Sequence, residues 1–256
     1  MAISFEIVPR DEQATKTQIE FIGKHLDFVD TINVPDLLRL PIRSWDADQY
    51  VNRQHYQFIP HVRSIDFDLK TERLQKIIEQ HQLNNILIVS GDPPPDMSHQ
   101  IYDTDVLDLI KIIRADFPEI KIFAGFDPYR SSIKQERQYI EKKFNAGVDA
   151  ILSQPFFDMR LLEIYSEFIP SDKVYWGISP VVTDKSKAYW EKMNHAIFPA
   201  DYQATYDWNI ETAKRILEFA TDQGSHVYFM PIRINLESYF LPLLDMARKL
   251  IGNTKT

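Results

Sequence analysis

The sequence predicts an α/β protein built as a single (β/α)8 barrel, and three observations support this fold. Short apolar runs rich in β-branched residues alternate with amphipathic helical stretches along the chain, which is typical of consecutive βαβ units. Eight such units can be counted, and 256 residues is the usual length of one such barrel. Because no linker or low-complexity tract divides the chain, we expect one domain over residues 1–256.

The expected strands are short apolar runs that end at proline, glycine or a polar residue. The clearest is 86–89, where four consecutive apolar residues, too few for a buried helix, precede Gly91. A run without alternation indicates a strand that is buried on both faces, as in a parallel sheet. We expect the eight strands at residues 3–8, 28–34, 58–65, 86–89, 121–126, 150–156, 174–178 and 227–232.

Helices are expected between the strands, where apolar residues recur with a period of 3.6. After the first strand, Ile19, Ile22 and Leu26 share one helical face. Gly147 follows the helix expected at 132–145 and is a suitable C-cap. The other helices are expected at 71–81, 104–116, 161–168, 185–193, 209–221 and 236–250, with a short helix at 47–54.

Composition excludes several classes of function. The 7 glycines form neither a G-x-G-x-x-G fingerprint nor a P-loop, which argues against a doubly wound nucleotide-binding sheet. The absence of cysteine excludes thiol nucleophiles, disulfides and thiolate metal sites. A net charge of −8 gives no basic surplus for nucleic acid or an anionic membrane. No signal peptide or membrane span is evident, so we expect a cytoplasmic protein.

The C-terminal ends of the expected strands carry mostly polar residues. In a (β/α)8 barrel these ends meet at one face, where active sites lie. No lysine is among them, which disfavours a Schiff base, and a single histidine makes a metal site unexpected. Asp127 and Ser179 each precede a proline and are interpreted as loop or capping residues. The complete set is Glu6, Asn33, His61, Asp92, Asp127, Gln154, Ser179 and Arg233.

Glu6 and Asp92 are the strongest candidates for chemistry. Strand alternation places Glu6 on the same face as Ser4, inside the barrel, where poor solvation raises a carboxyl pKa and suits a general acid. The alternative for Glu6 is a structural ion pair with Arg233 across the barrel. Asp92 follows the strand 86–89 and precedes three prolines, residues 93–95, which make the loop stiff; the alternative there is an ordinary turn.

Several segments, in order along nearly the whole chain, resemble the methylenetetrahydrofolate reductases, which are flavoprotein (β/α)8 barrels. The most specific is Asn145 to Asp158, which is similar to the family pattern D-A-G-A-x-x-x-x-T-Q-x-F-F-D. The other matching segments are Ser4-Phe5-Glu6 with Pro9, Pro60-His61 leading to Ile65-Asp66, Gly91-Asp92 with the prolines, Gly177-Ile178-Ser179-Pro180, and Tyr228 to Arg233.

The resemblance implies a reaction and its cofactors. It implies reduction of 5,10-methylenetetrahydrofolate to 5-methyltetrahydrofolate through bound FAD, with NAD(P)H as electron donor, in one-carbon metabolism and methionine biosynthesis. Folate and nicotinamide are then the small-molecule partners, and a homo-oligomer is compatible with the family. A single catalytic domain would carry the whole reaction.

The resemblance also implies roles for individual residues. Glu6 takes the place of the acid that protonates the folate ring nitrogen, and Asp92 that of an aspartate touching both pterin and flavin. Gln154 matches a glutamine that contacts folate and nicotinamide in turn. Tyr206 matches an aromatic position that stacks on substrate, and Arg233 an arginine near the folate tail. The residues at flavin contact positions are His61, Ser90, Gly91, Asp92, Phe126, Glu136, Lys142 and Lys143.

Two departures from the family pattern leave alternatives open. Before Gly91 the family often has an arginine that reaches the flavin phosphates, whereas this chain has Ser90. The family segment Y-P-E-x-H-P has become Phe126-Asp127-Pro128-Tyr129-Arg130 and has lost its histidine. One alternative is therefore a C1-folate reductase that uses no flavin or another cofactor. The other is a non-catalytic folate- or flavin-binding subunit, which would have no need of the acid Glu6.

Overall fold

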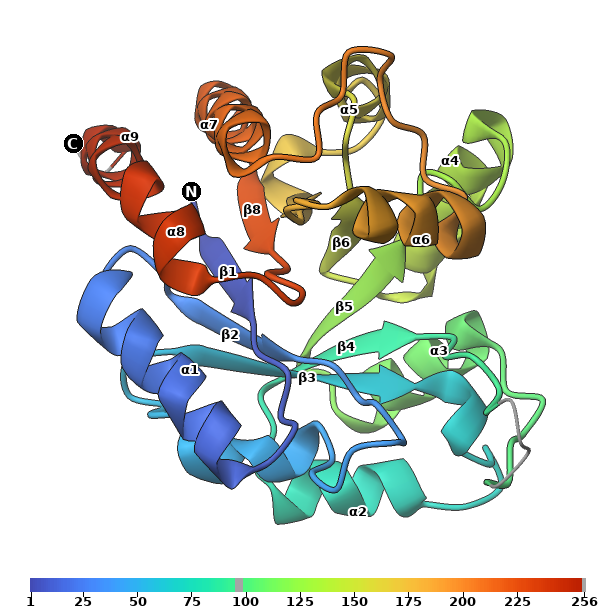
Figure 1. Ribbon diagram of the computed structural model, residues 1–256. Helices are drawn as coiled ribbons and strands as arrows, with labels where there is room; N and C mark the ends of the chain where they lie inside the picture. Colours follow the sequence, from blue (N-terminus) through green and yellow to red (C-terminus); the bar gives the residue numbers. More distant parts are fainter. Residues whose placement is uncertain (95–98, 255–256) are drawn as a thin grey trace.

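A computed structural model describes residues 1–94 and 99–254, and its eight parallel strands close into one barrel in sequence order (Figure 1). This confirms the predicted (β/α)8 fold. The barrel closes where β1 lies between β2 and β8, with Ser4 opposite Thr31 on one side and Tyr228 on the other. The strands are β1 (Ile3–Glu6), β2 (Thr31–Val34), β3 (Gln57–Arg63), β4 (Asn85–Val89), β5 (Lys121–Phe126), β6 (Ala150–Pro155), β7 (Val174–Ile178) and β8 (His226–Phe229).

Alternation along each strand separates two cores. Outward-facing residues such as Phe5 and Trp176 pack under the helices in the main core. The inner core of the barrel consists of Ile59, Leu87, Phe123, Ala150, Leu152, Tyr175, Tyr228 and Met230. The inward positions of β1 and β2 carry Ser4, Thr31 and Asn33, which are buried and polar. The barrel interior is thus apolar on the side of β4 to β7 and polar near β1 and β2, where Ser4, Thr31 and Asn33 are uncharged.

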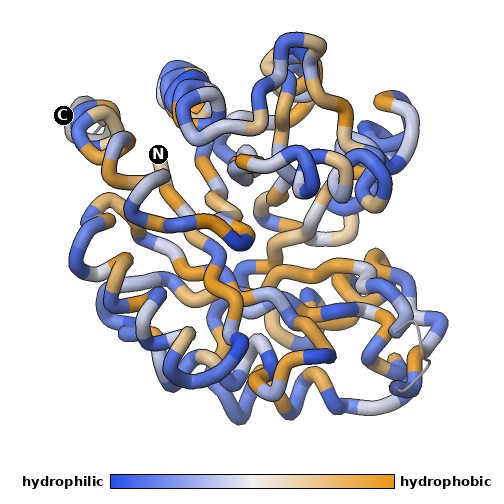
Figure 2. The backbone as a smooth tube through the Cα atoms, in the orientation of Figure 1, coloured by the Kyte–Doolittle hydropathy of each residue, from blue (hydrophilic) through white to orange (hydrophobic). Residues whose placement is uncertain are grey.

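The helices surround the barrel, with hydrophobic residues along the strands and hydrophilic residues mainly outside (Figure 2). N-caps at Asp11, Asp105, Ser132, Asp158, Thr183 and Thr205 accept hydrogen bonds from the first turns of their helices. Gly147 ends α4 in the left-handed conformation, as predicted. The helices are α1 (Glu12–His25), α2 (Arg73–Gln80), α3 (Val106–Asp116), α4 (Ile133–Ala146), α5 (Met159–Ser166), α6 (Asp184–Asn194), α7 (Tyr206–Gln223), α8 (Leu236–Phe240) and α9 (Leu244–Thr254).

Three expected helices differ from the structure in type, in continuity or by more than two residues at one end. The helix expected at 236–250 is divided into α8, a 3-10 turn at Leu241–Leu243, and α9, because Pro242 has no amide hydrogen for a continuous helix. The short helix expected at 47–54 is a 3-10 helix, Trp45–Tyr50. Helix α7 begins at Tyr206 rather than at residue 209, because the Thr205 side chain caps it there. No helix among the described residues is long and apolar enough to cross a membrane.

Candidate active site at the mouth of the barrel

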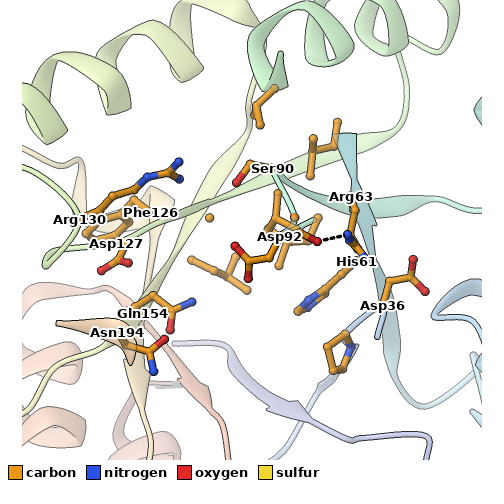
Figure 3. A pocket seen from close by; sticks show the side chains of 18 of the residues that line it. Asp36, His61, Arg63, Ser90, Asp92, Phe126, Asp127, Arg130, Gln154 and Asn194 are labelled. Atoms are coloured by element: carbon orange, nitrogen blue, oxygen red, sulfur yellow. Dashed lines mark hydrogen bonds between the residues drawn. The ribbon is translucent and has the colours of Figure 1, made fainter. Parts of the chain in front are cut away.

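The candidate site is a cavity of about 1500 Å³ at the C-terminal mouth of the barrel (Figure 3). It is bordered by the ends of β1, β3, β4, β5, β6 and β8, by the loop after β2 and by the end of α6. Pockets for drug-sized ligands usually have volumes of about 300–1000 Å³. This cavity can therefore hold a larger ligand, or two ligands side by side.

Glu6 ends β1 and forms part of the cavity wall, with Tyr228 of β8 as its hydrogen-bonding partner. The Tyr228 hydroxyl donates to Oε2 of the Glu6 carboxyl group. Burial raises the pKa of Glu6 to about 7, against the smaller opposing effect of this hydrogen bond. Glu6 is therefore a carboxyl group that can hold a proton near neutral pH and deliver it into the cavity.

A chain of neutral hydrogen bonds lies beside Glu6. The Asn33 amide nitrogen donates to the Ser4 hydroxyl, which leaves the Asn33 oxygen to face Nε2 of His61 at 3.3 Å. An amide oxygen only accepts hydrogen bonds, so this orientation of Asn33 requires the ring proton of His61 on Nε2. Burial lowers the pKa of His61 to about 3, so the ring is neutral at physiological pH. Ser4, Asn33 and His61 therefore add no formal charge to this wall.

The turn after β4 places Asp92 at the centre of the cavity. Figure 3 shows its carboxylate pointing into open space while its backbone carbonyl accepts a hydrogen bond from the Arg63 guanidinium. Gly91 has φ +79°, and a Cβ there would lie 2.6 Å from Nε of Arg63. Glycine is therefore required both by the backbone and by the packed guanidinium. Pro93 and Pro94 continue the turn, and Pro95 lies outside the described residues.

Lys143 of α4 places a buried cation at the end of β5. Its Nζ donates to the carbonyl of Gly125 at 2.6 Å and lies 4.0 Å from the ring centroid of Tyr139. Burial lowers the pKa of Lys143 to about 8, while Glu136 acts in the opposite direction. The ammonium group therefore remains mostly charged at neutral pH, in a place where an anionic ligand can contact it.

Glu136 and Asp127 organise the loop that follows β5. The Glu136 carboxylate accepts from the amide of Asp127 at 3.3 Å and from the hydroxyl of Ser131 at 3.3 Å. Asp127 accepts from the amide of Tyr129 at 2.9 Å, which agrees with its interpretation as a loop residue. Ser179, the other residue interpreted in this way, donates to the carbonyl of Met230. Arg130, from the same loop as Asp127, also borders the cavity.

Gln154 faces Asp92 from the opposite wall. It is exposed at the end of β6, beside Asn194 at the end of α6 (Figure 3). Its amide can both donate and accept hydrogen bonds, so it suits a polar ring edge placed between it and Asp92.

The structure brings most of the predicted site residues to the cavity, but not all of them. Lys142 is exposed on α4, and Arg233 is exposed in the loop after β8. Tyr206 packs on the main core, and its hydroxyl accepts from the amide of Asn235. The remaining residues all border the cavity; they are Glu6, His61, Ser90, Gly91, Asp92, Phe126, Glu136, Lys143 and Gln154. Their individual roles stay predictions.

Two of these positions need qualification. Phe126 borders the cavity, but its ring packs against Phe156, Tyr165 and Trp176 outside the barrel. The ion pair considered between Glu6 and Arg233 is wrong: within the described chain Arg233 makes no ion pair, and the partner of Glu6 is Tyr228. Arg233 lies in an exposed turn after β8 and has a positive φ of 54°.

Sequence reasoning missed several residues at this site. Tyr228 could have been found from strand alternation in β8 together with the closure of β8 onto β1. Arg63 follows His61 at an inward position of β3, so alternation also predicts it. Asn194 and His195 come from the end of a helix, where no local pattern indicates a site. The missed residues are Arg39, Arg63, Arg130, Asn194, His195 and Tyr228.

The family model for methylenetetrahydrofolate reductase matches residues 44–214 of the chain. The chain belongs to the methylenetetrahydrofolate reductase family. Members of this family are folate-related reductases and are generally associated with flavin. The match includes Asp92, Lys143 and Gln154 but neither Glu6 nor Tyr228, whose assignment therefore depends on the geometry at the mouth of the barrel. No curated protein sequence matches the chain.

Solved structures show the same fold at low sequence identity. The catalytic domain of a hyperthermophilic chitinase from Pyrococcus furiosus has a TM-score of 0.57 at 12% identity, covering 98% of this chain and 97% of that one. A truncated 3-deoxy-D-arabino-heptulosonate 7-phosphate synthase from Thermotoga maritima has a TM-score of 0.52 at 10% identity, covering 100% and 87%. A 2,3-dimethylmalate lyase has a TM-score of 0.55 at 10% identity, covering 100% and 82%. These similarities establish the barrel and no activity.

Among the described residues, no group of three or more His, Asp or Glu side chains is arranged to hold a metal ion. The polar groups at the mouth are instead single carboxyl, amide, imidazole and cationic groups from several strands, loops and helices. Such a set can bind a planar polar ligand, hold an anionic group and transfer a proton.

Proposed function

We propose that this member of the methylenetetrahydrofolate reductase family reduces 5,10-methylenetetrahydrofolate to 5-methyltetrahydrofolate, with FAD as cofactor and NAD(P)H as electron donor. The observation that carries the proposal is Glu6, a carboxyl group with a pKa near 7 in the wall of a cavity that also presents Asp92 and Gln154. Opening the five-membered ring of the folate needs a proton on the departing nitrogen. Residues 1–256 would form the single catalytic domain for this reaction.

The residues at the mouth fit a flavin dinucleotide. A cavity of about 1500 Å³ is large enough for a dinucleotide and a second planar ring. Lys143, Arg63 and Arg130 supply cationic donors for a diphosphate, and Lys143 is held in place by Gly125 and Tyr139. These three cations offset the absence of an arginine at Ser90. FAD, when bound, would accept a hydride from the nicotinamide and supply it to the folate.

The protein's own groups would orient the folate and move the proton. Asp92 would accept hydrogen bonds from the donor edge of the pterin, because a fixed carboxylate binds a guanidine-like edge strongly. Gln154, across the cavity, would contact the nicotinamide and the folate in turn, since both would use the same open face. Glu6 would give its proton to the ring nitrogen that leaves the methylene carbon and would be reprotonated from the solvent-filled cavity.

The absorbance spectrum of the purified protein tests this proposal. A flavin spectrum that is bleached by NADH or NADPH and restored by 5,10-methylenetetrahydrofolate is expected. The product of the second step should be 5-methyltetrahydrofolate by mass spectrometry. A protein that gains no flavin on reconstitution yet reduces the folate would instead identify a flavin-free reductase. Folate binding without turnover under any reductant would indicate a non-catalytic subunit.

A further inference from the structure

Glu6 has two carboxyl oxygens, and the structure distinguishes them. Oε2 accepts the hydrogen bond from Tyr228. Oε1 makes no hydrogen bond within the described residues. In the same part of the chain, Tyr239 Oη is the one side-chain polar atom that is both buried and without a partner, so Oε1 is not a buried atom. Oε1 is therefore accessible, and Glu6 borders the cavity. The two oxygens thus have different surroundings: one faces a hydroxyl inside the barrel and the other faces the substrate space.

We infer that Tyr228 is a positioning residue that keeps the acidic proton of Glu6 on Oε1, the oxygen that faces the cavity. A hydroxyl that donates to Oε2 competes with a proton on that oxygen, so the protonated form of Glu6 carries its hydrogen on Oε1. The inference rests on the proposed function, because it assigns to Tyr228 a part in the proton transfer by Glu6. It concerns a residue outside the range matched by the family model.

The barrel holds Tyr228 rigidly enough for this role. Ser4 and Tyr228 are register partners on adjacent parallel strands, and Glu6 lies two residues closer to the mouth on the same face as Ser4. Tyr228 is 3% exposed and belongs to the inner core with Tyr175 and Met230. A side chain packed in this way has little rotational freedom, so its hydroxyl stays directed at one carboxyl oxygen.

No charged group competes with the hydroxyl for Glu6. On β2 the inward residues are Thr31 and Asn33, which are uncharged, and on β3 His61 is neutral. The Arg63 guanidinium is directed to the Asp92 carbonyl and to Asp66. Asp36 in the loop after β2 is paired with Arg43, and the β6 residues that border the cavity, Leu152, Ser153 and Gln154, are uncharged. Tyr228 is thus the titratable group in contact with Glu6 within the described residues.

Tyr228→Phe tests the inference, with Tyr175→Phe as the matched control. The bond from Tyr228 stabilises the ionised carboxylate, so its removal should raise the midpoint of Glu6 titration by about one pH unit. The alkaline limb of the folate half-reaction should move upward with it, and its plateau should fall several-fold because the proton is no longer confined to Oε1. Tyr175→Phe removes a hydroxyl from the same inner core on the adjacent strand and should change neither quantity.

The Glu6 midpoint can be measured without substrate, as the infrared carbonyl band of the protonated carboxyl group in the difference from Glu6→Gln. A wild-type protein that lacks folate turnover, while the Glu6 midpoint still differs between wild type and Tyr228→Phe, is a separate outcome. That result would refute the proposed reaction but support the hydrogen bond from Tyr228 to Glu6. Incorporation of 3-fluorotyrosine at position 228 keeps the packing and strengthens the donor, so it should lower the midpoint even if the phenylalanine variant fails to fold. An unchanged midpoint and an unchanged alkaline limb would overturn the inference.

Discussion

The two walls of the mouth differ in whether their ionisable groups are neutral or charged. In the wall formed by β1, β2, β8 and His61 of β3, hydrogen-bonded groups avoid charge: the pKa of Glu6 is raised and that of His61 is lowered, both by burial. The wall formed by β4, β5 and α4 keeps its charges, with Asp92 exposed and Lys143 mostly protonated. One wall is thus suited to proton transfer and the other to holding a charged ligand.

One barrel thus separates proton transfer from the binding of a charged ligand. On the first wall, inward polar residues satisfy one another, so a carboxyl group there is poorly solvated and holds its proton. On the second wall, a backbone carbonyl and an aromatic ring stabilise the ammonium group of Lys143 without neutralising it. Three experiments test this division.

Glu6→Gln should have the largest effect, confined to the proton-transfer wall. Hydride transfer from nicotinamide to flavin needs no proton from Glu6, so flavin reduction should continue at a near-normal rate. Folate turnover should fall by about a hundredfold or more, because general acid catalysis typically contributes 10²–10⁴-fold. Stopped-flow measurement of the two half-reactions separates these effects. Folate turnover within a few-fold of wild type would mean that another group is the acid.

Lys143→Met should affect the charged wall, and Lys142→Met is its control on the same helix. If Lys143 contacts the diphosphate of FAD as proposed, loss of its ammonium group should weaken FAD binding by about tenfold to a hundredfold, as expected for a charge-assisted hydrogen bond. Lys142 is exposed and does not border the cavity, so its substitution should leave the affinity within about twofold. Calorimetric titration with FAD gives both values. Equal losses in the two variants would contradict the assignment.

A third effect is on stability rather than on binding or turnover, and it follows from the pKa of Glu6. This pKa is raised from 4.5 to about 7, so the native state binds a proton that the unfolded chain has released between these values. The contribution of Glu6 to wild-type stability should therefore decrease as pH rises through this window, and Glu6→Gln should lack this contribution. The difference in unfolding free energy should grow by up to about 3 kcal/mol between pH 4 and pH 8.

Urea unfolding of both proteins across this range measures that difference. The effect of His61 has the opposite direction, because its lowered pKa makes the native state less stable as pH falls below about 6.5. It is common to both proteins and cancels in the comparison. A constant difference between Glu6→Gln and wild type at all pH values would show that the Glu6 carboxyl group is not held protonated.

Much of the fold could be predicted because its determinants are local. Runs such as 86–89 indicate strands by their composition, and alternation alone places Glu6 and Ser4 on the inner face of β1. The C-terminal helix was predicted less well, because Pro242 lies within a pattern whose apolar period continues across it. The turn at Gly91 and Asp92 was also locally determined, since the positive φ and the following prolines are properties of these residues.

The sequence by itself determined that eight strand–helix units bring Glu6, Asp92 and Gln154 to one end of a barrel, because strand ends and side-chain alternation are local properties. Only the tertiary structure decided which groups they meet. Tyr228 is 222 residues from Glu6 and contacts it because β8 closes onto β1, whereas Arg233, five residues later, lies in an exposed turn. Closure and register depend on the packing of the whole sheet, and that packing raises the pKa of Glu6.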